Sequence, residues 1–224
     1  MSGTVSIIIL TLNEQSTIEG LLRHLAELQP HEIIIADGGS TDRTRELAAP
    51  YATVIQTAAG RGTQLNAGAA RATGDILWFL HADVRVGPAV LRQITGALQS
   101  PEIAGGNLDI VYEGGREAPI LTSINRTRRR FGIFYGDSGI FCRREIFQQL
   151  GGYPPWPLLE DYAFARRLAK RYRLALLDEP IHVSPRRWQK AGLLHTLWFW
   201  FWIQALFIAG VSPHRLASWY RHIR

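Results

Sequence analysis

DILWFLHAD, from Asp75 to Asp83, decides the fold of this 224-residue chain. Five apolar residues, Ile76 to Leu80, follow one another without polar alternation. Such a run predicts a strand covered on both faces, as in a parallel sheet, and ligands of such sheets gather at the carboxyl ends of the strands. Asp83 is therefore expected at a ligand-binding edge. The alternative is that Asp83 caps a helix that follows the strand.

Strands and helices alternate around this stretch. The expected strands cover residues 5–10, 33–36, 54–55, 75–80, 105–112, 139–142 and 174–177. Apolar residues at helical spacing predict helices over residues 17–28, 43–49, 64–72, 90–98, 120–130, 145–150 and 160–172. This alternation predicts an α/β fold with a doubly wound, mostly parallel sheet, followed by a hydrophobic helical tail.

The charge of +6 is concentrated in the last part of the chain. Residues 180–224 contain six Lys or Arg and no Asp or Glu, whereas the first 179 residues carry 19 of each sign. Five of the seven tryptophans also lie in this segment. Basic flanks around aromatic sequence suggest an anionic membrane surface rather than nucleic acid. The single Cys142 excludes an internal disulfide framework, and we expect a cytoplasmic location.

The tail contains 19 consecutive residues without a charge, Leu193 to Val211. A helix of this length can span a bilayer, and the alternatives are packing in an oligomer, such as a homodimer, or in the protein's own core. We expect one large domain, residues 1–188, and a tail, residues 189–224. We expect the tail to hold the protein peripherally at the inner face of the cell membrane.

Three loops of the first half are expected to open on the same edge of the sheet. Polar side chains there can bind a base and ribose, and a carboxylate can hold a divalent cation against phosphate. The pattern therefore predicts a nucleotide with a metal-bridged diphosphate, and neither a G-x-G-x-x-G nor a P-loop motif is present. Close backbone approach is expected at Gly60, Gly62 and Gly68. The candidate binding residues are Thr11, Asn13, Glu14, Asp37, Arg61, Asn66, Ala82 and Asp83.

An ordered set of motifs resembles the inverting glycosyltransferases of family 2, which have the GT-A fold. The motifs are VSIIILTLNE from Val5, ADGGSTDRT from Ala36, LNAGAARATGDILWFLHAD from Leu65, GDSGIFCRRE from Gly136, LGGY from Leu150 and LLEDYAFARRL from Leu158. The resemblance extends to about Trp188. A narrower resemblance, carried by FLHAD and the later RRW, is to a short bacterial subfamily named for arsenosugar biosynthesis.

The resemblance implies transfer of a sugar from a nucleoside diphosphate sugar, UDP-sugar favoured, to an acceptor hydroxyl with Mg²⁺ or Mn²⁺. It assigns Asp37 to the nucleotide base and Asp83 to the metal. His81 stands where the family's D-x-D motif has its first acid, and Gly38 replaces a second acid of the D-D-G-S turn. The acceptor is open, and either a lipid-linked or a small molecule is compatible.

Glu160 and Asp161 match the family's ED motif, in which the Asp is the general base. Direct displacement at the anomeric carbon needs a carboxylate opposite the departing diphosphate. The alternative is that both acids complement the dipole of the helix that they begin. For the acceptor or diphosphate side, the resemblance suggests Gly136, Asp137, Arg186, Arg187 and Trp188.

Several assignments have a plainer alternative. Arg186 to Trp188 can be a basic, membrane-facing linker, and His182 can be either a metal ligand or an ordinary loop histidine. Arg126 to Arg130 can steer an anionic acceptor or form a solvated helix face. Two other functions remain open: nucleotidyltransfer to a sugar phosphate, and a non-catalytic, membrane-associated nucleotide-binding module.

Overall fold

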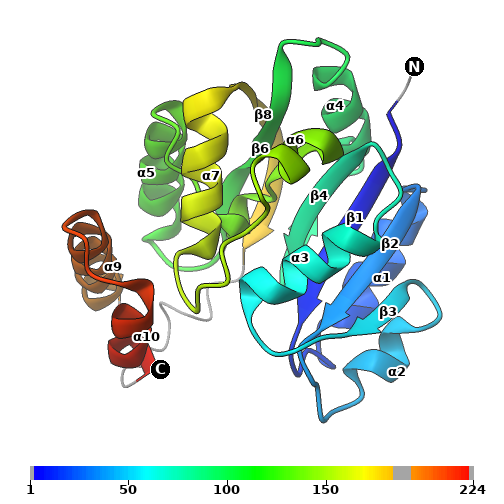
Figure 1. Cartoon of the computed structure of the whole chain (residues 1–224), viewed down its shortest axis with the longest axis horizontal. Helices are drawn as coiled ribbons and strands as arrows, with labels where there is room; N and C mark the ends of the chain where they lie inside the picture. Colours follow the sequence, from blue (N-terminus) through cyan, green and yellow to red (C-terminus); the bar gives the residue numbers. More distant parts are fainter. Residues whose placement is uncertain (1–2, 184–192, 222–224) are drawn as a thin grey trace.

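A computed structural model describes residues 3–183 and 193–221. Within them, a single eight-stranded sheet has the order β3-β2-β1-β4-β7-β6-β8-β5 (Figure 1). The strands are β1 Val5–Thr11, β2 Glu32–Asp37, β3 Thr53–Gln56, β4 Ile76–His81, β5 Val84–Val86, β6 Ile103–Tyr112, β7 Phe141–Arg143 and β8 Arg173–Val183. β1 to β4 are mutually parallel, whereas β7 runs antiparallel to both of its neighbours. The predicted mostly parallel sheet is confirmed.

The strand register brings the expected loops to one edge. Thr11 pairs with Asp37, and Leu10 pairs with His81. Because these strands are parallel, their carboxyl ends open side by side, as expected from the sequence.

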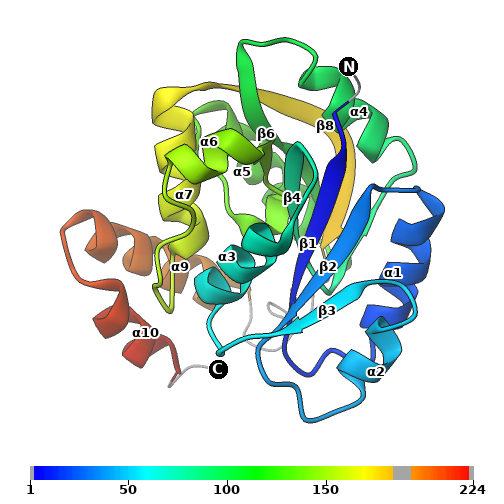
Figure 2. The same ribbon diagram turned by 45° about the vertical axis from the view of Figure 1, so that its right-hand side comes forward.

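Helices cover both faces of the sheet (Figure 2). One face packs against α1 Ile18–Glu27, α2 Thr44–Ala48 and α4 Val90–Ala97. The other packs against α3 Arg61–Arg71, α6 Arg144–Gln149 and α7 Glu160–Arg171. The all-apolar run of β4 reflects this double coverage, since Trp78 faces the first core and Phe79 the second. α5 Ala118–Arg130 packs on β6, and a short helix, η1 Gly136–Ser138, contacts β4 and β6.

Two details differ from the sequence-based expectation. Asp83 is followed by β5, and α4 begins only at Val90, so the alternative interpretation of Asp83 as a helix cap is excluded. β8 extends for 11 residues to Val183, because it continues to pair with β6 beyond the apolar segment. His182 therefore lies in a strand and not in a loop.

The tail forms two helices at one end of the molecule (Figure 1), α9 Leu193–Ile208 and α10 Pro213–Arg221. The break between them contains Gly210, at φ 92°, and is followed by Pro213. Within the described parts of the chain, no helix is both long and apolar enough to cross a membrane.

Candidate active site

Asp37 organises the turn that follows β2. Its side chain is fully buried and accepts hydrogen bonds from the amides of Gly39 (3.1 Å) and Ser40 (2.8 Å). The hydroxyls of Ser40 (2.5 Å) and Thr11 (2.9 Å) also donate to it. Burial alone would raise the pKa of Asp37, but these four donors outweigh it and lower that pKa below its ordinary value. Asp37 is thus held ionised at the edge of the sheet.

The loop after β1 is tied to this turn. Asn13 adopts φ 57°, a left-handed conformation that Asn tolerates better than most residues. Its side-chain oxygen accepts from the amide of Thr41 at 2.9 Å, and its own amide donates to Ser40 Oγ at 2.9 Å. The amide of Glu14 donates to Thr44 Oγ1 at 2.7 Å. The TLNE loop and the DGGSTD turn therefore form one preorganised surface.

Gln64 on α3 is a site residue that sequence reasoning missed. Its side-chain amide is almost fully buried and donates to the carbonyls of Thr11 (2.9 Å) and Ala36 (2.8 Å). A Cβ at Gly38 would lie only 3.0 Å from this side chain. The approach of Gln64 thus accounts for glycine at position 38. The one available signal was a polar residue beside the apolar Leu65 at the start of a helix.

A second cluster lies where the first turns of α3 and α7 meet the end of β4. Arg61 begins α3, and its Nε donates to Glu160 Oε1 at 2.5 Å. Its Nη2 lies 2.8 Å from His81 Nε2 and 3.9 Å from Asp161 Oδ2. Because a guanidinium only donates, His81 Nε2 must be the acceptor, which selects the neutral tautomer protonated at Nδ1. Arg61 and His81 are thereby joined to Glu160 and Asp161, which lie far from them in the sequence.

Asp161 is positioned by backbone amides. Gly136 donates to Asp161 Oδ2 at 2.8 Å, and Tyr162 donates to Oδ1 at 2.7 Å. A Cβ at Gly136 would lie 3.1 Å from both Asp161 Oδ2 and His81 Nε2, so a side chain there would crowd both groups. Leu159, just before this helix, has φ 62°, a strained conformation for leucine. The lack of a side chain at Gly136 and the strained backbone at Leu159 therefore both lie close to Asp161.

The charges in this cluster are strongly coupled. Glu160 is 1% exposed, and burial raises its pKa above the ordinary value although Arg61 acts to lower it. Burial also opposes the charge on Arg61, but Glu160 and Asp161 outweigh that effect and raise the pKa of Arg61. Arg61 is therefore a permanent cation that two carboxylates share.

Residues 6–151 match the family model described as Glycosyl transferase family 2. The chain belongs to this family. An uncharacterized glycosyltransferase of Nostoc is 29% identical over 153 residues, which cover 58% of this chain and 48% of that relative. Glycosyltransferase AglE of Haloferax volcanii is 24% identical over 169 residues, covering 67% and 56% respectively. The chain spans about half the length of these two relatives.

The structure of this family member is also similar to solved structures with the GT-A fold. Residues 1–349 of Staphylococcus aureus TarS have a TM-score of 0.68 at 18% identity, over 81% of this chain and 60% of that fragment. Glucosyl-3-phosphoglycerate synthase from Mycobacterium tuberculosis, crystallised with Mn²⁺, UDP and glucosyl-3-phosphoglycerate, has a TM-score of 0.60 at 23% identity, over 81% and 70%. The expected GT-A fold is confirmed.

Asp83 provides a carboxylate suited to a divalent cation. It lies half-buried between β4 and β5 and makes no hydrogen bond or ion pair with the residues that the structure describes. Among those residues, no three His, Cys, Asp or Glu side chains gather into a metal site. The acceptor nitrogen of His81 is engaged by Arg61. A cation at Asp83 would therefore take its remaining ligands from a diphosphate and water, as Mg²⁺ commonly does.

Asn66 and His182 make contacts within the protein. Asn66 Nδ2 donates to the carbonyl of Tyr153 at 2.8 Å, and its Oδ1 accepts from the Tyr153 amide at 2.9 Å. Asn66 thus joins α3 to the LGGY turn. On β8, His182 is paired in register with Arg85 of β5. Its Nδ1 lies 3.1 Å from Oε1 of Glu113, the residue after β6, without forming a hydrogen bond.

The basic run on α5 is largely paired. Arg126 and Arg129 both bind Asp109, at 2.6 Å and 3.0 Å. The guanidinium of Arg128 lies 5.3 Å from the centre of the Tyr135 ring. Three of the five residues therefore stabilise the packing of α5. Arg186, Arg187 and Trp188 lie outside the described residues.

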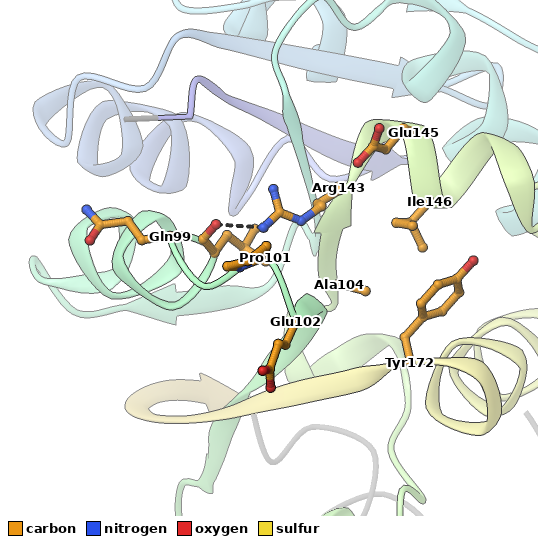
Figure 3. Close-up of a pocket in the computed structure, with 9 residues that line it drawn as sticks. Gln99, Pro101, Glu102, Ala104, Arg143, Glu145, Ile146 and Tyr172 are labelled. Atoms are coloured by element: carbon orange, nitrogen blue, oxygen red, sulfur yellow. Dashed lines mark hydrogen bonds between the residues drawn. The ribbon is translucent and has the colours of Figure 1, made fainter. Parts of the chain in front are cut away.

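The opposite edge of the sheet holds an unrelated hollow of about 640 Å³. Arg143 pairs with Ile76 at the start of β4, and it donates to the carbonyl of Leu98 at 2.7 Å (Figure 3). The hollow also contains Glu102, Glu145 and Tyr172. Since His81 is at the other end of β4, this hollow is separate from the candidate active site.

Proposed function

We propose that this protein transfers a sugar from a nucleoside diphosphate sugar, with UDP-sugar favoured, to an acceptor hydroxyl with inversion and with Mg²⁺ or Mn²⁺. The observation that carries the proposal is the convergence of the end of β4 and the start of α7 on Gly136. His81 Nε2 and Asp161 Oδ2 each lie 3.1 Å from the Cβ position of that residue. The FLHAD strand supports the narrower arsenosugar-named subfamily as part of this proposal.

Inversion requires the acceptor oxygen to attack the anomeric carbon from the side opposite the leaving diphosphate. Asp161 is assigned as the general base that takes the acceptor proton. The amides of Gly136 and Tyr162 fix the direction of its carboxylate, and its side chain remains 14% exposed. Asp161 is thus accessible to an acceptor while its orientation is set by backbone, which limits reorganisation during the reaction.

The leaving diphosphate gains negative charge, which cations at the donor edge would stabilise. Asp83 is assigned to hold a divalent cation that neutralises this charge when bound. The surface built from Thr11, Asn13, Glu14 and Asp37 is assigned to the base and ribose, with the Ala82 backbone beside it. Gly136 and Asp137 are assigned to the acceptor side, with residues 186–188 as further candidates.

The substitution Asp161→Asn tests the base. It removes the proton acceptor and keeps the size of the side chain, although its single oxygen can accept from only one of the two backbone amides. Transfer should fall by about 10² to 10⁴-fold. Binding of UDP with Mn²⁺, measured by calorimetry, should stay within about twofold, because Asp161 is not assigned to the nucleotide. Asp178→Asn, on the exposed part of β8, is the matched control and should leave both quantities unchanged. Near-normal turnover of D161N would overturn the assignment.

The substitution Asp83→Asn tests the metal site. Mn²⁺ binding in the presence of UDP, measured by electron paramagnetic resonance, should weaken about 10 to 100-fold because the only assigned protein carboxylate is lost. The thermal unfolding midpoint should not change, since the carboxylate has no hydrogen bond or ion pair in the described structure. Unaltered Mn²⁺ binding would place the cation elsewhere.

A further inference from the structure

One face of α9 is apolar and exposed. Trp198, Phe201, Trp202 and Ile208 are 61%, 65%, 45% and 71% exposed. Their spacing places them on one side of a helix, and α9 contains no charged residue. We call these four side chains the α9 outer face. Exposed apolar side chains gathered in this way mark a surface that contacts something other than water.

The opposite face of α9 is anchored to the protein. Ile203 is 2% exposed and packs in a cluster with Leu159, Tyr162 and Leu216. Phe207 contacts Tyr162 edge-on, with ring centres 6.0 Å apart. Because the inner face is already packed, the direction of the α9 outer face is fixed. The helix therefore presents a defined apolar surface.

The chemistry of this surface fits a lipid interface. The 16 residues of α9 extend about 24 Å, less than the hydrocarbon core of a bilayer, and the packed inner face prevents insertion across it. Tryptophan favours the boundary between lipid and water. A helix of this kind is suited to lying in the plane of the interface.

The positive charge of the tail is complementary to an anionic surface. The last acidic residue of the chain is Glu179, and six Lys or Arg follow it. In α10, exposed Arg215 precedes exposed Trp219 by one helical turn. We propose that the α9 outer face docks on an anionic phospholipid surface. A second copy of this chain would match the apolar face but not the excess of positive charge.

This docking would place the candidate active site near the lipid. Tyr135 donates from its hydroxyl to Gln204 of α9 at 2.7 Å, and its ring stacks on Tyr162 with centres 5.6 Å apart. These two tyrosines directly adjoin Gly136 and Asp161. The side of the site assigned to the acceptor thus faces the same end of the molecule as α9. The docking itself does not depend on the proposed transfer reaction.

Flotation of the full chain with vesicles tests the proposal. Phosphatidylcholine vesicles containing phosphatidylglycerol should carry the protein, and added salt or omission of phosphatidylglycerol should weaken the association. The triple variant Trp198→Ser, Phe201→Ser, Trp202→Ser should bind these vesicles about 100-fold more weakly. Phe131→Ser, at the 76% exposed residue after α5, is the matched control and should bind as wild type. Circular dichroism and the thermal midpoint establish that each variant is folded.

Three outcomes would overturn the proposal. The wild-type protein could fail to float with anionic vesicles, or the folded triple variant could float equally well. The third outcome is a dimer, detected by light scattering without lipid, that the triple variant converts to monomer, because the face would then be covered by a second copy. D161N should float as wild type, so failure of the docking and failure of the proposed reaction are distinguishable.

Discussion

Replacement of Arg61 by methionine tests how the charges of the candidate active site are balanced. Arg61 Nε contacts Glu160 Oε1 at 2.5 Å, and Glu160 is 1% exposed. The substitution Arg61→Met keeps most of the apolar stem but removes the cation. Glu160 is then left either as an unpaired buried carboxylate or as a neutral acid.

The expected loss in the free energy of unfolding follows from how deeply the ion pair is buried. Removal of one partner from a buried ion pair costs about 3–5 kcal/mol. Because the Arg61 side chain is 31% exposed, water can partly replace it, and we expect a loss near the lower end, about 3 kcal/mol. For a domain of this size, that loss corresponds to a decrease of about 6–12 °C in the thermal midpoint.

The stability loss of R61M should change with pH in a direction that tests this explanation. Burial raises the pKa of Glu160 in the folded protein, and removal of Arg61 should raise it further. An acid with a raised folded pKa favours folding while it is protonated, and this contribution is lost as the pH rises through the folded pKa. The deficit of R61M should therefore be largest near pH 8 and shrink as the pH falls toward the ordinary Glu value.

Urea denaturation measures the free energy of unfolding of four proteins: wild type, R61M, Glu160→Gln and the double variant. Each is measured at pH 8 and at a pH near the ordinary pKa of Glu. E160Q should restore part of the stability of R61M at pH 8, because the unpaired charge is gone. An equal deficit at both pH values, or a double variant no more stable than R61M, would refute the reasoning.

Two further substitutions test the packing around the site. Gly68→Ala would place a Cβ 2.4 Å from Ile8 Cγ2, so α3 must shift from β1, and the free energy of unfolding measured with urea should fall by about 1–3 kcal/mol. Gly20→Ala on α1, where nothing lies within 4 Å of the new Cβ, should instead raise the free energy of unfolding by about 0.5–1 kcal/mol. Equal effects of the two substitutions would contradict this account. Tyr135→Phe removes the hydrogen bond to Gln204 and should cost about 1 kcal/mol at pH 7. Burial raises the pKa of Tyr135 to about 12, so wild type should lose this contribution as the pH rises from about 10 to 12, whereas Y135F should lack that part of the alkaline decline in thermal stability.

Strands β1, β2 and β4 of the parallel half were predictable because each is covered on both faces. Ile33 to Ala36 and Ile76 to Leu80 are unbroken apolar runs, and both are strands in the structure. β8 was only partly predictable. Its second half includes Asp178, Glu179 and Pro180, which read as a loop, but pairing with β6 after an irregularity at Asp109 extends the strand. Long-range pairing overrides local sequence there.

In the candidate site, too, features carried by a short segment could be predicted, whereas long-range contacts could not. Asp83 and Asp161 could be predicted as site residues because each lies in a short motif. The pairing of Arg61 with Glu160, 99 residues apart, has no local signal, and the sequence suggested only a nucleotide contact for Arg61. Gly62 and Gly68 were expected to allow the approach of a ligand. Instead, their Cβ positions lie 2.4 Å from Pro154 O and Ile8 Cγ2, so protein atoms occupy that space.

The histidine at position 81 follows from this charge balance. Arg61 already serves two carboxylates, Glu160 and Asp161, and burial works against the charge of Glu160. A carboxylate at position 81, within 2.8 Å of the same guanidinium, would add a third negative charge to one cation and raise the pKa of its neighbours further. A neutral imidazole accepts the same hydrogen bond without adding charge. The residue that departs from the D-x-D motif is therefore the one that contacts Arg61, whereas Asp83, which has no such contact in the described structure, retains the acid.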